Sequence, residues 1–192
     1  MKTTSLFTAA LVLVATLAAV PAAHAGRSCE ARKISTQALA QGMNLAQRTV
    51  ASLDASGHQV VLLARAGQDL SRYGLRYSHL GFAYRQADAG GGHVWRVLHK
   101  LNHCGTAESA VYRHGLGDFF LDDLWRHEAA WVAPPAEMQA RLLVLLQDNT
   151  QASALHHKAY SIVSYAWGQR YQQSNQWAIE TLARAADPAI TT

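Results

Sequence analysis

Apolar positions along the chain follow two periods, one of three to four residues and one of two, which predicts a mixture of helices and strands. The segment 35–53 has the helical period, and Ser35 before it is a suitable N-cap while Gly57 stands in the turn beyond. We expect this first helix to pack through one stripe of side chains: Leu39, Met43, Ala46, Val50 and Leu53.

Three strands are predicted after this helix. Val60–Ala64 is apolar on both faces, which is typical of a central strand. The segments 77–84 and 93–101 alternate in polarity, and the glycine-rich stretch 88–92 between them predicts the turn of a hairpin. On the period of two, His79 shares a face with Gly81, and the missing side chain at Gly81 leaves room for a ligand to approach the imidazole.

The hairpin brings two histidines together. If the turn is centred near Ala89, residues pair when their numbers sum to about 178, which places His79 opposite His99 on one face, with Cβ atoms about 5 Å apart. A slip of one residue would move them to opposite faces.

The remaining elements are less regular. We expect a short helix over 107–112, apolar anchors over 115–121, a strand over 128–133, and an extended stretch over 160–167. Helices are predicted after Pro135, with a stripe of Met138, Leu142 and Leu145, and from Ser174 to a point before Pro188. This order predicts an α+β fold in which a small antiparallel sheet packs on helices.

The N-terminus has the three parts of a secretory signal: Lys2, an apolar run over 6–20, and Ala23-His24-Ala25 as a cleavage site. The run is shorter than the about 20 residues of a membrane span. We therefore expect cleavage after Ala25, one domain over 26–192, no transmembrane segment in the mature chain, and a periplasmic or secreted protein.

The charge and the apolar content of the chain limit which partners we expect. Loss of residues 1–25 removes Lys2 and lowers the formal charge from +4 to +3. This charge is small and dispersed along the chain, so it favours neither nucleic acid nor an anionic membrane surface as a partner. The apolar content of 49% argues against disorder.

Two cysteines, Cys29 and Cys104, remain after cleavage. In an oxidising compartment we expect them to form a disulfide, worth about 4 kcal/mol in the loop-entropy model. The alternative is a free Cys104 that acts as a nucleophile, although Cys104-Gly105 is typical of a turn and not of a helix start.

Ser174 is the candidate nucleophile because the first turn of a helix has unpaired N–H groups and the positive end of the helix dipole. His79 would accept its proton, and His99 would fix the tautomer of His79. Gln173 and Asn175 would support an oxyanion. The alternatives are that Ser174 only caps its helix and that His79 is a hydrogen-bonded core residue.

A metal site at His99, His103 and His114 is a further alternative. No recognisable ligand spacing supports it, and we expect neither a metal nor a cofactor.

Five segments carry a resemblance to a known family: 65–70, 77–84, 97–105, 112–123 and 171–177. They resemble an uncharacterised family of exported bacterial proteins, the domain of unknown function 2145. The resemblance covers nearly the whole mature chain, and it implies a fold without a known activity.

More distantly, Ser78-His79-Leu80-Gly81, with a polar residue at His99 on the next strand, resembles the histidine strand of NlpC-type papain-like cell-wall hydrolases. The histidine precedes the nucleophile helix, as in circularly permuted members. Those enzymes have cysteine where this chain has Ser174. The resemblance implies a papain-like hydrolase or acyltransferase that acts on amide or ester bonds of a peptide or acyl ligand in the cell envelope. The alternative is a catalytically inactive periplasmic module that binds through the same cleft.

Overall fold

A computed structural model describes residues 33–165 and 167–190. Its centre is a five-stranded antiparallel sheet in the order β4-β3-β2-β1-β5. The strands are β1 (Val60–Arg65), β2 (His79–Ala87), β3 (His93–Asn102), β4 (Ser109–Gly115) and β5 (Ala129–Val132). The helices are α2 (Thr36–Ser56), η1 (Ser71–Tyr73), α3 (Leu116–Phe120), α4 (Ala136–Gln147), α5 (Asn149–Ser153) and α6 (Ser174–Ala186). The α+β class is confirmed.

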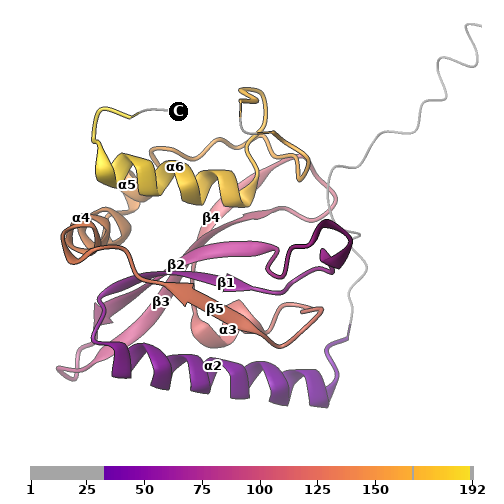
Figure 1. Ribbon diagram of the computed structural model, residues 1–192, viewed down its shortest axis with the longest axis vertical. Coiled ribbons are helices and arrows are strands. Elements are labelled where there is room, and N and C mark those ends of the chain that lie inside the picture. The colour runs from indigo at the N-terminus through magenta and orange to yellow at the C-terminus, as the bar shows by residue number, and fades with distance from the viewer. Residues whose placement is uncertain (1–32, 166, 191–192) are drawn as a thin grey trace, which may run out of the picture.

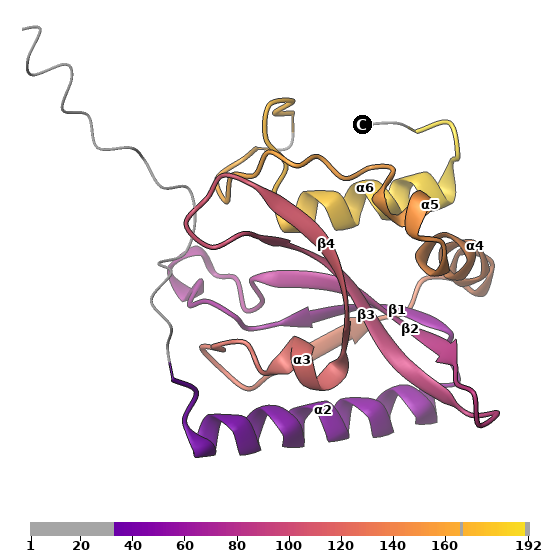
Figure 2. The same ribbon diagram turned by 180° about the vertical axis from the view of Figure 1, so that it is seen from behind.

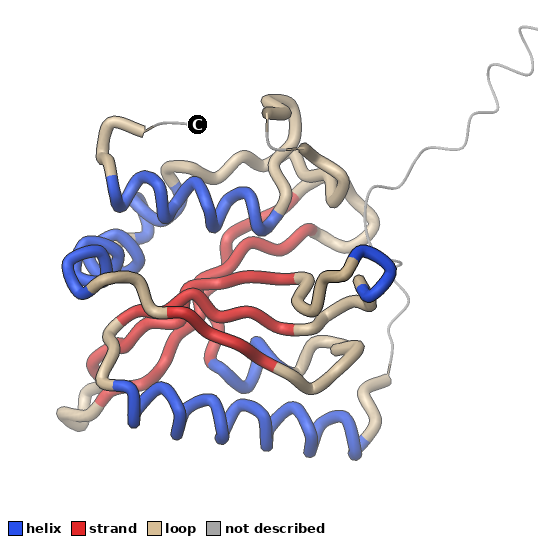
Figure 3. Tube along the Cα trace, in the orientation of Figure 1, coloured by secondary structure: helices blue, strands red, loops and turns tan. Residues whose placement is uncertain are grey.

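The described elements form three layers, with helices on both faces of the sheet (Figure 1, Figure 2). One apolar cluster, which includes Phe82 and Trp177, lies between the sheet and helices α4, α5 and α6. The other, which includes Ala83 and Phe119, lies between the sheet and helices α2 and α3. Figure 3 shows the strands enclosed between these helical layers. Because side chains alternate along a strand, even-numbered residues of β2 face α6 and odd-numbered ones face α3.

Helix α2 begins and ends where the sequence predicts, with Ser35 as N-cap and Gly57 as C-cap in a left-handed conformation. The predicted packing stripe is only partly correct. Leu39, Met43 and Val50 are exposed, and the buried face consists of Gly42, Leu45, Ala46, Thr49 and Leu53. Gly42 and Thr49 hide this face from a search for apolar residues, yet a Cβ at Gly42 would lie 2.8 Å from the carbonyl oxygen of Phe120. Close packing against α3 therefore selected the face.

The register of the β2–β3 hairpin differs from the prediction by two residues. Partners sum to 180, as in Phe82 and Leu98, so the turn is centred on Gly90 and not on Ala89. His99 is therefore opposite Gly81 and not opposite His79. A shift of two preserves the face, so both histidines still lie on the same side of the sheet.

Two other predictions are wrong. The segment 107–112 is not a helix, because Ser109–Gly115 forms the edge strand β4. Its residues are mostly half-buried on both faces, which removes the alternation that identifies a strand. The described residues of the segment 160–167 form no strand: Ile162, Val163 and Trp167 lie in turns, and the others have no regular secondary structure. The strand at β5 and the helices that begin near Pro135 and at Ser174 are confirmed.

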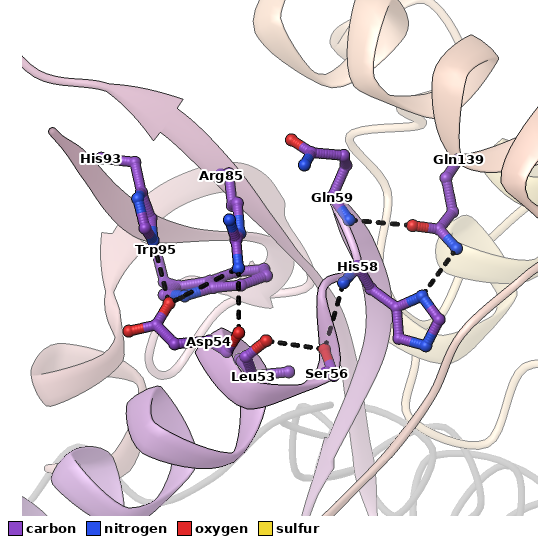
Figure 4. Close-up of polar contacts among 9 residues, drawn as sticks. All are labelled: Leu53, Asp54, Ser56, His58, Gln59, Arg85, His93, Trp95 and Gln139. Atoms are coloured by element: carbon purple, nitrogen blue, oxygen red, sulfur yellow. Dashed lines mark hydrogen bonds and ion pairs between the residues drawn. The ribbon is translucent and has the colours of Figure 1, made fainter. Parts of the chain in front are cut away.

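Polar contacts fasten α2 and α4 to the sheet at the end remote from the cleft described below (Figure 4). Asp54 accepts hydrogen bonds from Trp95 Nε1 at 2.8 Å and from His93 Nε2 at 2.9 Å. These bonds, the one from Trp95 above all, lower the pKa of Asp54. Gln139 accepts a hydrogen bond from the backbone N–H of Gln59 at 2.9 Å. These contacts attach the C-terminal end of α2 to the turn end of the β2–β3 hairpin, and the start of α4 to the start of β1.

Residues 1–25 and Cys29 lie outside the described part of the chain, so the signal peptide and the Cys29–Cys104 disulfide stay predictions. No described cysteine carries a free thiol, which argues against Cys104 as a nucleophile. None of the described helices combines the length and the apolarity needed to cross a bilayer.

Candidate functional site

Three histidines form a hydrogen-bonded line across β2, β3 and β4. His79 Nε2 lies 2.8 Å from His99 Nδ1, and His99 Nε2 lies 3.0 Å from His114 Nδ1. Both pairs are diagonal neighbours, because His99 is opposite Tyr112 and His114 is opposite Val97. Phe119 of α3 covers the line, with its ring centroid 5.1 Å from that of His99. The line is thus held by strand register and by one aromatic side chain.

Gly81 makes the contact between His79 and His99 possible. It lies between them on the same face, and a Cβ there would be 3.0 Å from His99 Cβ and 2.9 Å from Val97 Cγ1. These distances are shorter than ordinary carbon contacts of about 3.5–4.0 Å. Any side chain at this position would therefore push β2 away from β3.

His79 and His99 are neutral near pH 7, because their pKa values are lowered. Burial, followed by the positive charge of Arg65, lowers the pKa of His79 well below its ordinary value. The same causes lower the pKa of His99 to about 3. A neutral imidazole donates from one nitrogen and accepts at the other, so the tautomers in the line are coupled. If Nδ1 of His79 is to accept a proton, its Nε2 must donate to His99, and His99 must in turn donate to His114.

The sheet opens between β2 and β3 directly beside this line. Their ladder stops at Phe82 and Leu98, so the N–H of Leu80 has no partner on β3. Asn175 of α6 replaces that partner: its Oδ1 accepts from the N–H of Leu80 at 2.9 Å, and its Nδ2 donates to the carbonyl of Ser78 at 3.3 Å. The opening allows groups from both faces of the sheet to reach one cavity.

A cavity of about 350 Å³ fills this opening. His79 reaches it from β2, whereas Ser174 and Asn175 reach it from the N-terminal end of α6, which no side chain caps. Ser174 is buried, and its side chain forms a hydrogen bond with the hydroxyl of Tyr160. No hydrogen bond joins Ser174 to His79 among the described residues, so the two side chains share the cavity without direct contact through a hydrogen bond.

A second cavity, of about 640 Å³, lies at the other end of the histidine line. Its lining includes His99, His114, Cys104 and Asp118. His114 was considered only as a metal ligand from the sequence, but here it continues the line from one cavity to the other. The described residues contain no group of three or more side chains suited to a metal ion.

Arg65 lies between the two cavities and lines both. It is buried, with its guanidinium 4.6 Å from the Phe119 ring centroid, and its Nη2 donates to Asp122 Oδ2 at 2.6 Å. This cation disfavours a second positive charge on His79 or His99. Its role could not be predicted from the sequence, because Arg65 stands at the end of an apolar strand with no catalytic motif around it.

Lys100 is a second buried cation, on the opposite face of β3. Its Nζ donates to the carbonyl of His157 at 2.7 Å and to Gln172 Oε1 at 2.5 Å. Burial lowers its pKa to about 8, although Glu180 opposes that effect. The network ties the segment before α6 to the sheet and so supports the position of Ser174.

The structure brings His79, Gln173, Ser174 and Asn175 to one cavity and places His99 directly behind His79. Gln173 Nε2 donates to the carbonyl of Ser164 at 3.3 Å. Since the carboxamides of Gln173 and Asn175 already bind backbone groups, their support of an oxyanion stays a prediction, as do the catalytic roles of His79, His99 and Ser174.

A family model described as an uncharacterized protein conserved in bacteria, DUF2145, matches residues 52–192. Comparisons with curated proteins and with solved structures found no match. The similarity to NlpC-type enzymes therefore stays a prediction.

Proposed function

The chain belongs to this uncharacterised bacterial family. We propose its function from the cavity of about 350 Å³, which we call the cleft: acyl transfer or hydrolysis at an amide or ester bond. One observation carries the proposal. His79 uses Nε2 for the hydrogen bond to His99, and its ring lines the cavity that Ser174 also lines, at the uncapped end of α6. The second nitrogen, Nδ1, is then available as the base.

In the proposed reaction, Ser174 Oγ attacks the carbonyl carbon of the ligand while His79 Nδ1 accepts the hydroxyl proton. N–H groups in the first turn of α6 stabilise the oxyanion. His79 then returns the proton to the leaving amine or alcohol as its bond to carbon breaks. Water or an acceptor nucleophile releases the acyl group from Ser174 by the reverse steps.

The proposed ligand is a peptide or acyl group of the cell envelope, as the resemblance to NlpC-type enzymes implies, and the export predicted from residues 1–25 is compatible with it. The proposal includes neither a cofactor nor a nucleic-acid partner.

A binding module without activity is the second candidate, and two observations favour it. The Ser174 hydroxyl is bonded to Tyr160, and the strongly lowered pKa of His79 makes that imidazole a weak base. Serine is also a weaker nucleophile than cysteine unless its base is well placed.

Hydrolysis of p-nitrophenyl acetate and p-nitrophenyl octanoate separates the two candidates. If Ser174 is the nucleophile, Ser174→Ala should lower the rate by at least about a thousandfold. Ser153→Ala is the control, because Ser153 lies on α5 and its hydroxyl donates to the carbonyl of Asn149. No turnover by the wild type, or equal rates in Ser174→Ala, would reject the acyl-transfer proposal.

Ser174→Cys tests whether the cleft can activate a nucleophile at all. The helix end should stabilise a thiolate and the neutral His79 should accept the thiol proton, so iodoacetamide should alkylate this variant at pH values well below the ordinary thiol pKa of about 8.5. The double variant Ser174→Cys/His79→Ala should lose this reactivity, and the wild type controls for Cys29 and Cys104. An ordinary thiol pKa in Ser174→Cys would favour the binding module.

A further inference from the structure

Six of the fifteen large hydrophobic side chains that are exposed on the described surface lie in two segments beside the cleft. Leu75 and Ile162, one from each segment, also line its cavity. We call these six residues the rim; they are Tyr73, Leu75, Ile162, Val163, Tyr165 and Trp167.

The side chains of the rim are highly exposed, although apolar and aromatic side chains are usually buried. The exposed fraction is 83% for Val163, 68% for Tyr165 and 84% for Trp167. The loop between α5 and α6 stands out from the body near α6 (Figure 1). Exposed apolar side chains that gather beside a cleft mark an interaction site, whereas scattered single ones do not.

The charged residues of the two segments that contain the rim are all arginines. The segments 70–77 and 161–173 contain arginines but neither aspartate nor glutamate. Arg76 is paired with Glu128, whereas Arg72 and Arg170 form no ion pair with any described residue. Each of these two guanidinium groups lies over a neighbouring tyrosine ring, at 4.7 Å for Arg72 and 5.2 Å for Arg170.

The headgroup region of a bilayer is where tryptophan and tyrosine side chains are enriched, and anionic lipids attract arginine. The rim and its two flanking arginines combine these residue types. A second copy of the chain is a poorer occupant, because a symmetric contact would bring the arginines of both rims together with no carboxylate in either segment to pair with them.

We propose that the rim docks on an anionic lipid surface, with Val163, Tyr165 and Trp167 inserted at headgroup depth and Arg72 and Arg170 against the lipid phosphates. The cleft then opens beside the bilayer. The docking is independent of acyl transfer and also holds for a binding module. The small total charge of the chain does not predict this surface, because the surface forms only when two segments that are distant in the sequence come together.

Cosedimentation with vesicles tests the proposal, with residues 26–192, which include every described element. Binding should be stronger to phosphatidylcholine vesicles with about a quarter phosphatidylglycerol than to pure phosphatidylcholine. Tyr165→Ala/Trp167→Ala should lower the partition coefficient at least about tenfold. Arg72→Gln/Arg170→Gln should lower it about tenfold on anionic vesicles only.

Val144→Ala/Ile179→Ala is the matched control, because these side chains are 63% and 59% exposed but lie on α4 and α6, outside the two segments of the rim. It should bind as the wild type does, and so should Ser174→Ala, which separates docking from catalysis. Equal binding by the wild type and Tyr165→Ala/Trp167→Ala, or no binding to anionic vesicles, would overturn the proposal. Dimerisation in sedimentation velocity that Tyr165→Ala/Trp167→Ala abolishes would assign the rim to a second copy instead.

Discussion

Gly81→Ala should separate His79 from His99 and destabilise the sheet. The new Cβ would lie 2.9 Å from Val97 Cγ1, 3.0 Å from His99 Cβ and 3.1 Å from the carbonyl oxygen of Leu98. Only the Val97 methyl can rotate away, because the other two atoms are fixed to the backbone of β3. Ordinary contacts then require the strands to move apart by roughly 0.5 Å or more.

The expected loss of stability follows from two opposing effects. Overpacking of this kind costs about 1–3 kcal/mol, and replacement of a flexible glycine within a strand returns roughly 0.5–1 kcal/mol. From the midpoints of these ranges, the net decrease in the free energy of unfolding should be about 1 kcal/mol, which corresponds to a Tm decrease of about 2–4 °C. The longer distance should also break the His79 Nε2 to His99 Nδ1 hydrogen bond.

Thermal unfolding and NMR of ¹⁵N-labelled imidazoles measure the two effects separately. Gly117→Ala is the control, since its Cβ would meet Met43 Sδ at an ordinary 3.5 Å. It should leave Tm and the imidazole signals unchanged or raise Tm slightly. A Gly81→Ala protein with wild-type Tm and wild-type imidazole signals would refute the claim that this glycine determines the histidine contact.

Two further predictions concern charge. Arg65→Met should raise the pKa of His79 and His99 in an NMR titration, because Arg65 is the second-largest cause that lowers each; unchanged values would show that burial alone determines them. Unfolding free energy should fall as pH decreases below about 6.5, since the unfolded chain then binds protons that folded His79, His99 and, to a lesser extent, His156 do not. Each histidine can lower the unfolding free energy by at most about 1.4 kcal/mol per pH unit. Urea unfolding at about pH 7 and at about pH 5 measures the change, and equal free energies at the two pH values would contradict the prediction.

The sequence by itself predicted the elements whose signals are local. Ser35 and Gly57 bound α2 because capping depends on one residue and its nearest neighbours. The face shared by His79 and His99 was also predictable, since parity along a strand depends only on residue number. The start of the last helix at Ser174 was also predictable, from the apolar period that begins there, although no side chain caps this helix.

Only the tertiary structure decided the features that depend on contacts between distant segments. The hairpin register differs from the prediction by two residues because the turn is centred on Gly90, and the edge strand β4 exists because β3 pairs with it. Asn175 reaches β2 only because the sheet opens there. The rim likewise joins residues about ninety positions apart, whose charge and apolar character are unremarkable until the fold places them around one cleft. Local propensities are encoded in short windows of sequence, whereas register, opening and surface composition are set by the packing of the whole domain.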